Sequence, residues 1–184
     1  MAEMGKLFVV TGPSGAGVRD IAGAVLENRE DLVSVTPVTA RKKKAGEVDG
    51  VGYYFYDLDG WAALKESGDL LETTVLAGND YGTSRRLVAV RLEEGKNVLL
   101  SLEVERAAQL KANMPEAVCV YLEPSSEALL RERYAALARS SFELDVRMQR
   151  AREERALSGF CDCRIATDDP QQAVKELNDL IDRQ

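Results

Sequence analysis

Histidine is absent from the chain, and this absence excludes several chemistries at once. A Ser-His-Asp triad, a histidine-bearing zinc site and an imidazole pH switch all need that side chain. Any catalysis must therefore come from carboxylates, lysines, arginines, hydroxyls, backbone amides or a metal ion acquired from solution.

Cysteine is scarce, and the three thiols, Cys119, Cys161 and Cys163, do not provide a disulfide framework. Cys161 and Cys163 flank a single residue, so on a strand they point to the same side rather than around a metal. We interpret them as strand cysteines of a protein in a reducing compartment.

The chain also lacks excess positive charge and long apolar runs. It holds 24 Lys and Arg against 31 Asp and Glu, a formal net charge of -7. General nucleic-acid and anionic-membrane binders need a positive surface, so both are disfavoured. No stretch is long enough to span a bilayer, and the start of the chain does not fit a signal peptide. We expect a soluble, cytoplasmic protein with no nucleic-acid or membrane partner.

The chain contains alternating strand and helix patterns. Its 184 residues fit one globular domain, and 45% hydrophobic residues suffice for a buried core. Short apolar runs predict strands at 6–11, 97–102, 117–122 and 164–167. Helical periodicity marks 126–138, 144–157 and 171–181, and a helix-like stretch after Gly17 has Ile21, Val25 and Leu26 on one face. Such alternation predicts an α/β fold, a three-layer parallel-sheet core with helices on both faces.

Residues 35–86 differ from the rest of the chain in composition and in the spacing of their turns. They contain a basic segment at 41–44, turns at 49–50 and 78–79, and an aromatic run at 53–56. Short strands and one helix around Trp61 predict a small inserted mixed α/β subdomain. We expect it above the carboxyl ends of the core strands, where α/β sheets bind ligands.

A glycine-rich loop follows the first strand with the GxxxxG spacing of a phosphate-binding loop. Its backbone amides can surround an anion, and the residues assigned to this role are Gly12, Ser14, Gly15, Ala16 and Gly17. Val18 stands where such loops carry lysine, and Arg19 stands where they carry a hydroxyl. Either the loop only closes a strand-helix turn, or Arg19 acts as a substitute cation.

Three further motifs, in order, resemble the guanylate kinase family nearly from end to end. They are the segment 39–53 (TARKKKAGEVDGVGY), Leu71-Glu72 and the segment 78–83 (GNDYGT). The resemblance implies a nucleoside-kinase core with a GMP-binding subdomain and a short helical lid. We predict a core of 1–34, 91–126 and 146–184, a GMP-binding subdomain of 35–90 and a lid of 127–145.

The resemblance also assigns the residues of the GMP site. Arg41, Lys44, Tyr53 and Tyr81 match positions that hold the GMP phosphate, and Glu47 matches a glutamate that orients the basic segment. Glu72 and Thr83 match the positions that read guanine, with Glu103 near the acceptor base or a hydrated magnesium ion. The chemistry is consistent, because a carboxylate accepts the adjacent N–H groups of guanine and a hydroxyl serves its carbonyl oxygen.

Arginines and a strand end complete the predicted ATP side. Residues 131–155 hold seven arginines and no lysine, of which Arg147 and Arg139 match residues that clamp the transferring phosphate. We interpret the others as i,i+4 partners of acids on exposed helices. Thr167 and Asp168 resemble residues beside the adenine.

The family reaction is the ATP-dependent phosphorylation of GMP to GDP, with Mg²⁺. Here the GMP residues are kept, whereas Val18 and Arg19 replace residues of the ATP loop, so we expect weak or absent transfer. Two alternatives stay open. The chain is a guanine-nucleotide-binding protein without transfer, or a protein-interaction module like the guanylate kinase-like domains of scaffolds, with a protein partner.

Overall fold

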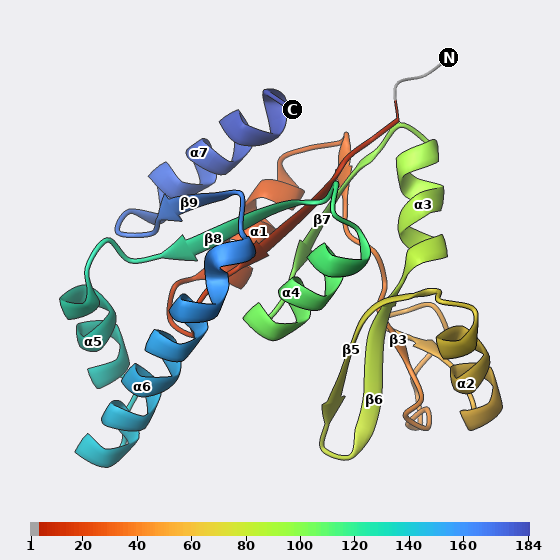
Figure 1. Ribbon diagram of the computed structural model, residues 1–184, viewed down its shortest axis with the longest axis horizontal. Helices are drawn as coiled ribbons and strands as arrows, with labels where there is room; N and C mark the ends of the chain where they lie inside the picture. Colours follow the sequence, from red (N-terminus) through yellow and green to blue (C-terminus); the bar gives the residue numbers. More distant parts are fainter. Residues whose placement is uncertain (1–3) are drawn as a thin grey trace.

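A computed structural model describes residues 4–184 of the chain, in which the larger of two sheets is parallel throughout. Its strand order is β2-β7-β1-β8-β9 (Figure 1). The strands are β1 (Leu7–Thr11), β2 (Leu32–Val33), β7 (Asn97–Ser101), β8 (Val118–Glu123) and β9 (Cys163–Ala166). All carboxyl ends therefore lie at one edge, where the loops that follow β1, β7 and β9 meet.

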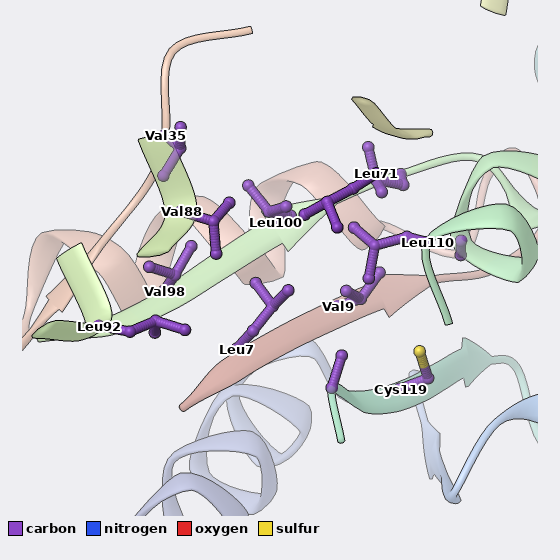
Figure 2. Packing of buried hydrophobic residues seen from close by; sticks show 13 residues of the cluster. Leu7, Val9, Val35, Leu71, Val88, Leu92, Val98, Leu100, Leu110 and Cys119 are labelled. Atoms are coloured by element: carbon purple, nitrogen blue, oxygen red, sulfur yellow. The ribbon is translucent and has the colours of Figure 1, made fainter. Parts of the chain in front are cut away.

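Helices cover both faces of this sheet because its strands are apolar on both sides. Leu7 and Val9 of β1 pack in one cluster with α3 (Arg85–Glu93) and α4 (Val104–Asn113), shown in Figure 2. Phe8 and Val10 point to the other face, against α1 (Val18–Glu27) and α7 (Pro170–Asp182). This alternation confirms the predicted three-layer core.

The second sheet is mixed and has the order β4-β3-β6-β5. Its elements are β3 (Val38–Thr39), β4 (Tyr54–Phe55), α2 (Leu58–Glu66), β5 (Leu70–Leu76) and β6 (Asn79–Ser84). A two-residue turn joins β5 to β6, and its residues Ala77 and Gly78 both have positive φ. The predicted subdomain with a helix around Trp61 is thus confirmed as a structural unit, with its second turn one residue earlier than expected.

Helices α5 (Glu127–Ala135) and α6 (Ser141–Leu157) pack on each other beside the core and are followed by the short helix η1 (Ser158–Phe160). Serine hydroxyls define where both begin, because Ser126 accepts from the Leu129 amide and Ser140 from the Glu143 amide. α6 therefore starts three residues before the periodicity predicts. The ranges predicted for the other helices and for the strands agree with the structure to within a few residues.

The domain limits stay predictions. The second sheet lies within the predicted range 35–90, but α3 crosses its end and buries Val88 and Leu92 in the core cluster. Residues 1–3 of the predicted core lie outside the described residues. Among helices of residues 4–184, none combines the length and apolarity needed to cross a bilayer.

Candidate functional site

The glycine loop curls between β1 and α1 as a phosphate-binding loop does. Gly15 and Gly17 both have φ of 78°, a conformation that side chains rarely allow. A Cβ on Gly12 would lie 2.0 Å from the Leu122 carbonyl oxygen, so only glycine lets the loop approach β8 this closely. Gly17 is the N-cap of α1 and offers no side chain to its first amides, which leaves the positive helix end free for an anion.

A cavity of about 830 Å³ opens beside this loop. Gly12, Ser14, Gly15 and Gly17 line it, while Ala16 is buried beneath. The cavity continues past Ser101, at the end of β7, to α4 and α6. The charged residues that line it are Arg19, Arg106, Arg147 and Arg150 with Asp20, Glu103, Glu143 and Glu154. Four cations face four acids, so the lining has no formal excess of positive charge.

Two of these arginines on α6 are already paired with acids one turn away. Arg147 donates to Glu143 at 2.8 Å, and Arg150 donates to Glu154 at 2.8 Å. Burial raises the pKa of Glu154, with Glu105 and Glu103 adding to the effect and Arg150 opposing it. The prediction for Arg147 agrees with its place in the cavity. Arg139 precedes α6, is exposed and does not line the cavity.

Arg133, which we interpreted as a helix-surface arginine, instead links three segments. Its guanidinium on α5 donates to the carbonyl oxygen of Gly15 at 3.3 Å and to that of Thr167 at 2.6 Å. The sequence interpretation of Arg133 is therefore wrong, since its partners are backbone oxygens far along the chain rather than an acid at i±4. No spacing rule connects α5 to these two loops.

The residues predicted beside adenine lie at the end of β9, outside the lining of the cavity. Thr167 is buried and accepts from Arg133 through its hydroxyl at 3.3 Å. The Asp168 carboxylate accepts from the amide and hydroxyl of Ser125, and these bonds lower its pKa. Both side chains are therefore bonded within the protein.

Four predicted GMP-site residues converge on one side of the second sheet. Arg41 makes a two-pronged ion pair with Glu47, at 2.8 and 3.0 Å, and lies over the Tyr53 ring at 5.6 Å from its centroid. Tyr53 and Tyr81 pack with centroids 5.6 Å apart. Arg41 and the Lys44 amide lower the pKa of Glu47 to about 2. Glu47 therefore stays charged near neutral pH and is bonded to both Arg41 and the Lys44 amide.

Lys44 lies at the edge of this cluster. Its backbone amide donates to Glu47 at 2.7 Å, whereas its side chain is exposed. Thr39 sits underneath, where its buried hydroxyl donates to the Asp80 carbonyl oxygen and accepts from the Arg41 amide. The turn that carries Arg41 is thus tied to the strand that carries Tyr81.

Glu72 and Thr83 are opposite each other on β5 and β6. The Thr83 hydroxyl donates to Glu72 Oε1 at 2.7 Å. Arg106, which sequence reasoning did not assign, donates to both carboxylate oxygens, from Nε at 2.6 Å and Nη2 at 2.8 Å. Although burial opposes its charge, Glu72 and then Glu103 raise the pKa of Arg106.

Comparisons with known proteins agree with this geometry. A sequence model described as guanylate kinase matches residues 4–184. A guanylate kinase of Enterococcus faecalis is 37% identical over 185 aligned residues, which cover 98% of this chain and 90% of that protein. One from Trichodesmium erythraeum is 34% identical over 180 residues, covering 97% of each. This chain belongs to the guanylate kinase family.

The fold of this guanylate kinase family member has a solved counterpart. The crystal structure of guanylate kinase from Anaplasma phagocytophilum superimposes with a TM-score of 0.68, at 23% sequence identity, over 98% of this chain and 86% of that one. That likeness supports the core and subdomain architecture and says nothing about individual side chains.

Magnesium is the ion that the family implies, and the donor set of the loop can be tested against it. Within residues 4–184, no three acidic or thiol side chains gather closely enough to hold a metal. Magnesium at phosphates needs only one or two protein oxygens, such as the hydroxyl that follows a phosphate loop. Arg19 occupies that position and donates only, so this position of the loop offers no oxygen to a magnesium ion, and an oxygen ligand would have to come from another residue of the lining such as Ser14 or Asp20.

Proposed function

We propose that this chain binds GMP at its second sheet and transfers a phosphoryl group from ATP to it weakly or not at all. The observation that carries this proposal is the contrast between the two sides of the site. In the cluster of Arg41, Glu47, Tyr53 and Tyr81 an ion pair already orients the arginine, whereas the lining of the loop cavity has no lysine and equal numbers of arginines and acids.

The GMP side has the groups that a phosphate monoester needs. A guanidinium carries five N–H donors, and the bonds of Arg41 to Glu47 and to the Lys42 carbonyl use three of them. Two N–H groups are not used by these bonds, and the Tyr53 ring, which packs on Tyr81, lies under the guanidinium. Glu47 fixes the orientation in advance, so binding loses less side-chain entropy.

The ATP side lacks what transfer needs most. In phosphoryl transfer the protein mainly positions charge against the developing negative oxygens. Val18 supplies no donor, and Arg147 and Arg150 are paired with Glu143 and Glu154. Removing one preorganised donor typically lowers kcat by about 100- to 1,000-fold. Arg19 also lines the cavity and is exposed. The other three arginines of the lining are in ion pairs, whereas none is seen for Arg19 among residues 4–184.

A nucleotide-binding role without transfer is the second candidate function, and the balanced charge of the cavity favours it. A triphosphate with its several negative charges gains little from a lining in which four arginines face four acids. Such a protein would report GMP without consuming it.

Calorimetric titration of GMP, and then of ATP with Mg²⁺, separates these functions. We expect GMP to bind and Glu72→Ala to abolish that binding, while Glu94→Ala, on the exposed end of α3, serves as the control. Unchanged GMP affinity in Glu72→Ala would refute the pocket. GMP binding without ATP binding favours the role without transfer, and binding of both, with GDP formed, establishes the enzyme.

A further inference from the structure

The carboxylate assigned to guanine already accepts three hydrogen bonds from the protein itself, and both of its oxygens are engaged. Glu72 Oε1 accepts from the Thr83 hydroxyl and from Arg106 Nη2, and Oε2 accepts from Arg106 Nε. The Glu72 side chain has 0% of its surface exposed, and that of Arg106 has 20%. A ligand therefore cannot reach Glu72 while Arg106 keeps this position.

Arg106 stands between the cavity and the base-reading pair. It lines the cavity of the glycine loop, but Glu72 and Thr83 do not. In Figure 1, α4 lies beside the β5-β6 hairpin on one side and α6 on the other. The open space on the core side thus ends at the guanidinium, and Glu72 is behind it.

Two side chains of α4 dock the helix that carries Arg106 on β5. Gln109, one turn further along the same face, accepts from the Thr73 amide at 3.1 Å. Asn113, a further turn along, donates to the Leu71 carbonyl oxygen at 2.9 Å. Both bonds dock α4 on β5 on either side of Glu72, so the direction of Arg106 results from the packing of the helix.

The donor edge of guanine and the guanidinium of Arg106 each present two adjacent N–H donors to a carboxylate. Guanine offers N1–H and an amino N–H side by side, and arginine offers two parallel N–H groups that match a carboxylate. Each needs both oxygens of Glu72. The two donors therefore exclude each other.

We propose that Arg106 is a specificity-determining residue that competes with guanine for Glu72, so that a guanine nucleotide binds only by displacing it. This inference rests on the proposed GMP site. A carboxylate this buried is costly to leave unpaired. Displacement is therefore favourable only for a base that restores both hydrogen bonds, and GMP affinity is lowered by the bonds that Arg106 gives up.

The test compares GMP affinity by calorimetry in Arg106→Ala and in the unaltered chain. We expect Arg106→Ala to bind GMP about tenfold more tightly or better, because two charge-assisted hydrogen bonds no longer have to break. Arg91→Ala, which breaks an exposed arginine-glutamate pair on α3, is the matched control and should leave affinity unchanged. Combined with Glu72→Ala, the gain from Arg106→Ala should vanish.

A second variant and a direct probe of Arg106 keep the proposal testable if Arg106→Ala does not fold. Arg106→Lys keeps the charge but spans only one oxygen, so a smaller gain is expected. In the unaltered chain, the ¹⁵N signal of Arg106 Nε–H should be protected from exchange without ligand and lose that protection when GMP is added. Protection that survives saturation with GMP would overturn the proposal.

The outcomes separate the two inferences. If the unaltered chain binds GMP and Arg106→Ala binds it equally or less tightly, competition is refuted and the GMP site stands. If neither protein binds GMP, the proposed function fails together with the competition. Tighter binding by Arg106→Ala that depends on Glu72 supports both.

Discussion

Replacing Val18 by Lys together with Arg19 by Ser tests the proposal that the loop cavity is a poor ATP site. The double change restores the phosphate-loop pattern but removes one cation while adding another. The lining keeps four cations and four acids, so its formal charge is unchanged. Any gain must then come from where the cation and hydroxyl lie, and not from a more positive cavity.

The structure shows where the new side chain would begin, and the general value of one preorganised donor gives the size of the gain. Val18 Cγ2 lies 3.1 Å from where a Cβ on Gly12 would be, so a side chain at this position starts above the beginning of the loop. An ammonium there reaches the space that the loop encloses, whereas Arg19 is exposed on the next residue. Restoring one preorganised donor predicts a rise of about 100- to 1,000-fold in kcat. Stability should change little, because a lysine stem covers apolar surface as valine does.

The rate of transfer is measured by a coupled assay of ADP formation at saturating GMP, with ATP and Mg²⁺. Calorimetry measures the affinity for ATP. Val18→Met with Arg19→Ser is the matched control, since methionine has a similar length and no charge. We expect transfer in the lysine variant to exceed that of the methionine variant by at least about 100-fold. Equal rates in the two variants would show that more than these two side chains separates the loop from activity.

Three further predictions concern stability, ionisation and thiol access. Thr83→Val removes a buried donor to a charged group, which costs about 1.5–3 kcal/mol, and calorimetry should show Tm lowered by about 3–12 °C, against no change for Thr74→Val. Because Glu47 has its pKa lowered from 4.5 to about 2, its pair with Arg41 should persist at pH 4 and break as pH falls through 2; a ¹³C titration midpoint near 4.5 would contradict this. Burial raises the pKa of Cys119 to about 11, so a disulfide reagent at pH 8 should modify this thiol slowly in the native chain and rapidly after unfolding.

Local sequence patterns predicted most of the fold. The run Leu7–Thr11 is buried on both faces, and continuous apolar runs of this kind occur in parallel strands covered by helices. The parallel sheet followed from the alternation of strands and helices, and the inserted subdomain from the change in composition near residue 35, whereas the strand order β2-β7-β1-β8-β9 was not predicted. Helix starts were harder to predict from the sequence. The periodicity places the start of α6 at residue 144, whereas Ser140 caps the helix and α6 begins at Ser141.

The grouping of the candidate residues could be predicted where they are close in sequence. Arg41 and Glu47 are six residues apart in one turn, and Glu72 and Thr83 are opposite each other in one hairpin. Arg133 and Arg106 were missed because their partners lie far along the chain, at Gly15 and Glu72. An arginine on an exposed helix face has the same local pattern as one that faces a site, and only the packing of the helix distinguishes them.

The same distinction explains why the two sides of the site differ without ligand. On the GMP side, Arg41 is held by Glu47 while part of its guanidinium remains available, so the ion pair orients the cation and leaves donors for phosphate. On the ATP side, Arg147 and Arg150 each use a neighbour on their own helix, and an incoming phosphate must compete with those carboxylates. Under the proposed function, ion pairing prepares one half of the site and neutralises the other. Adding arginines to α6 would then not by itself raise the rate of transfer, because the cation has to lie at the loop.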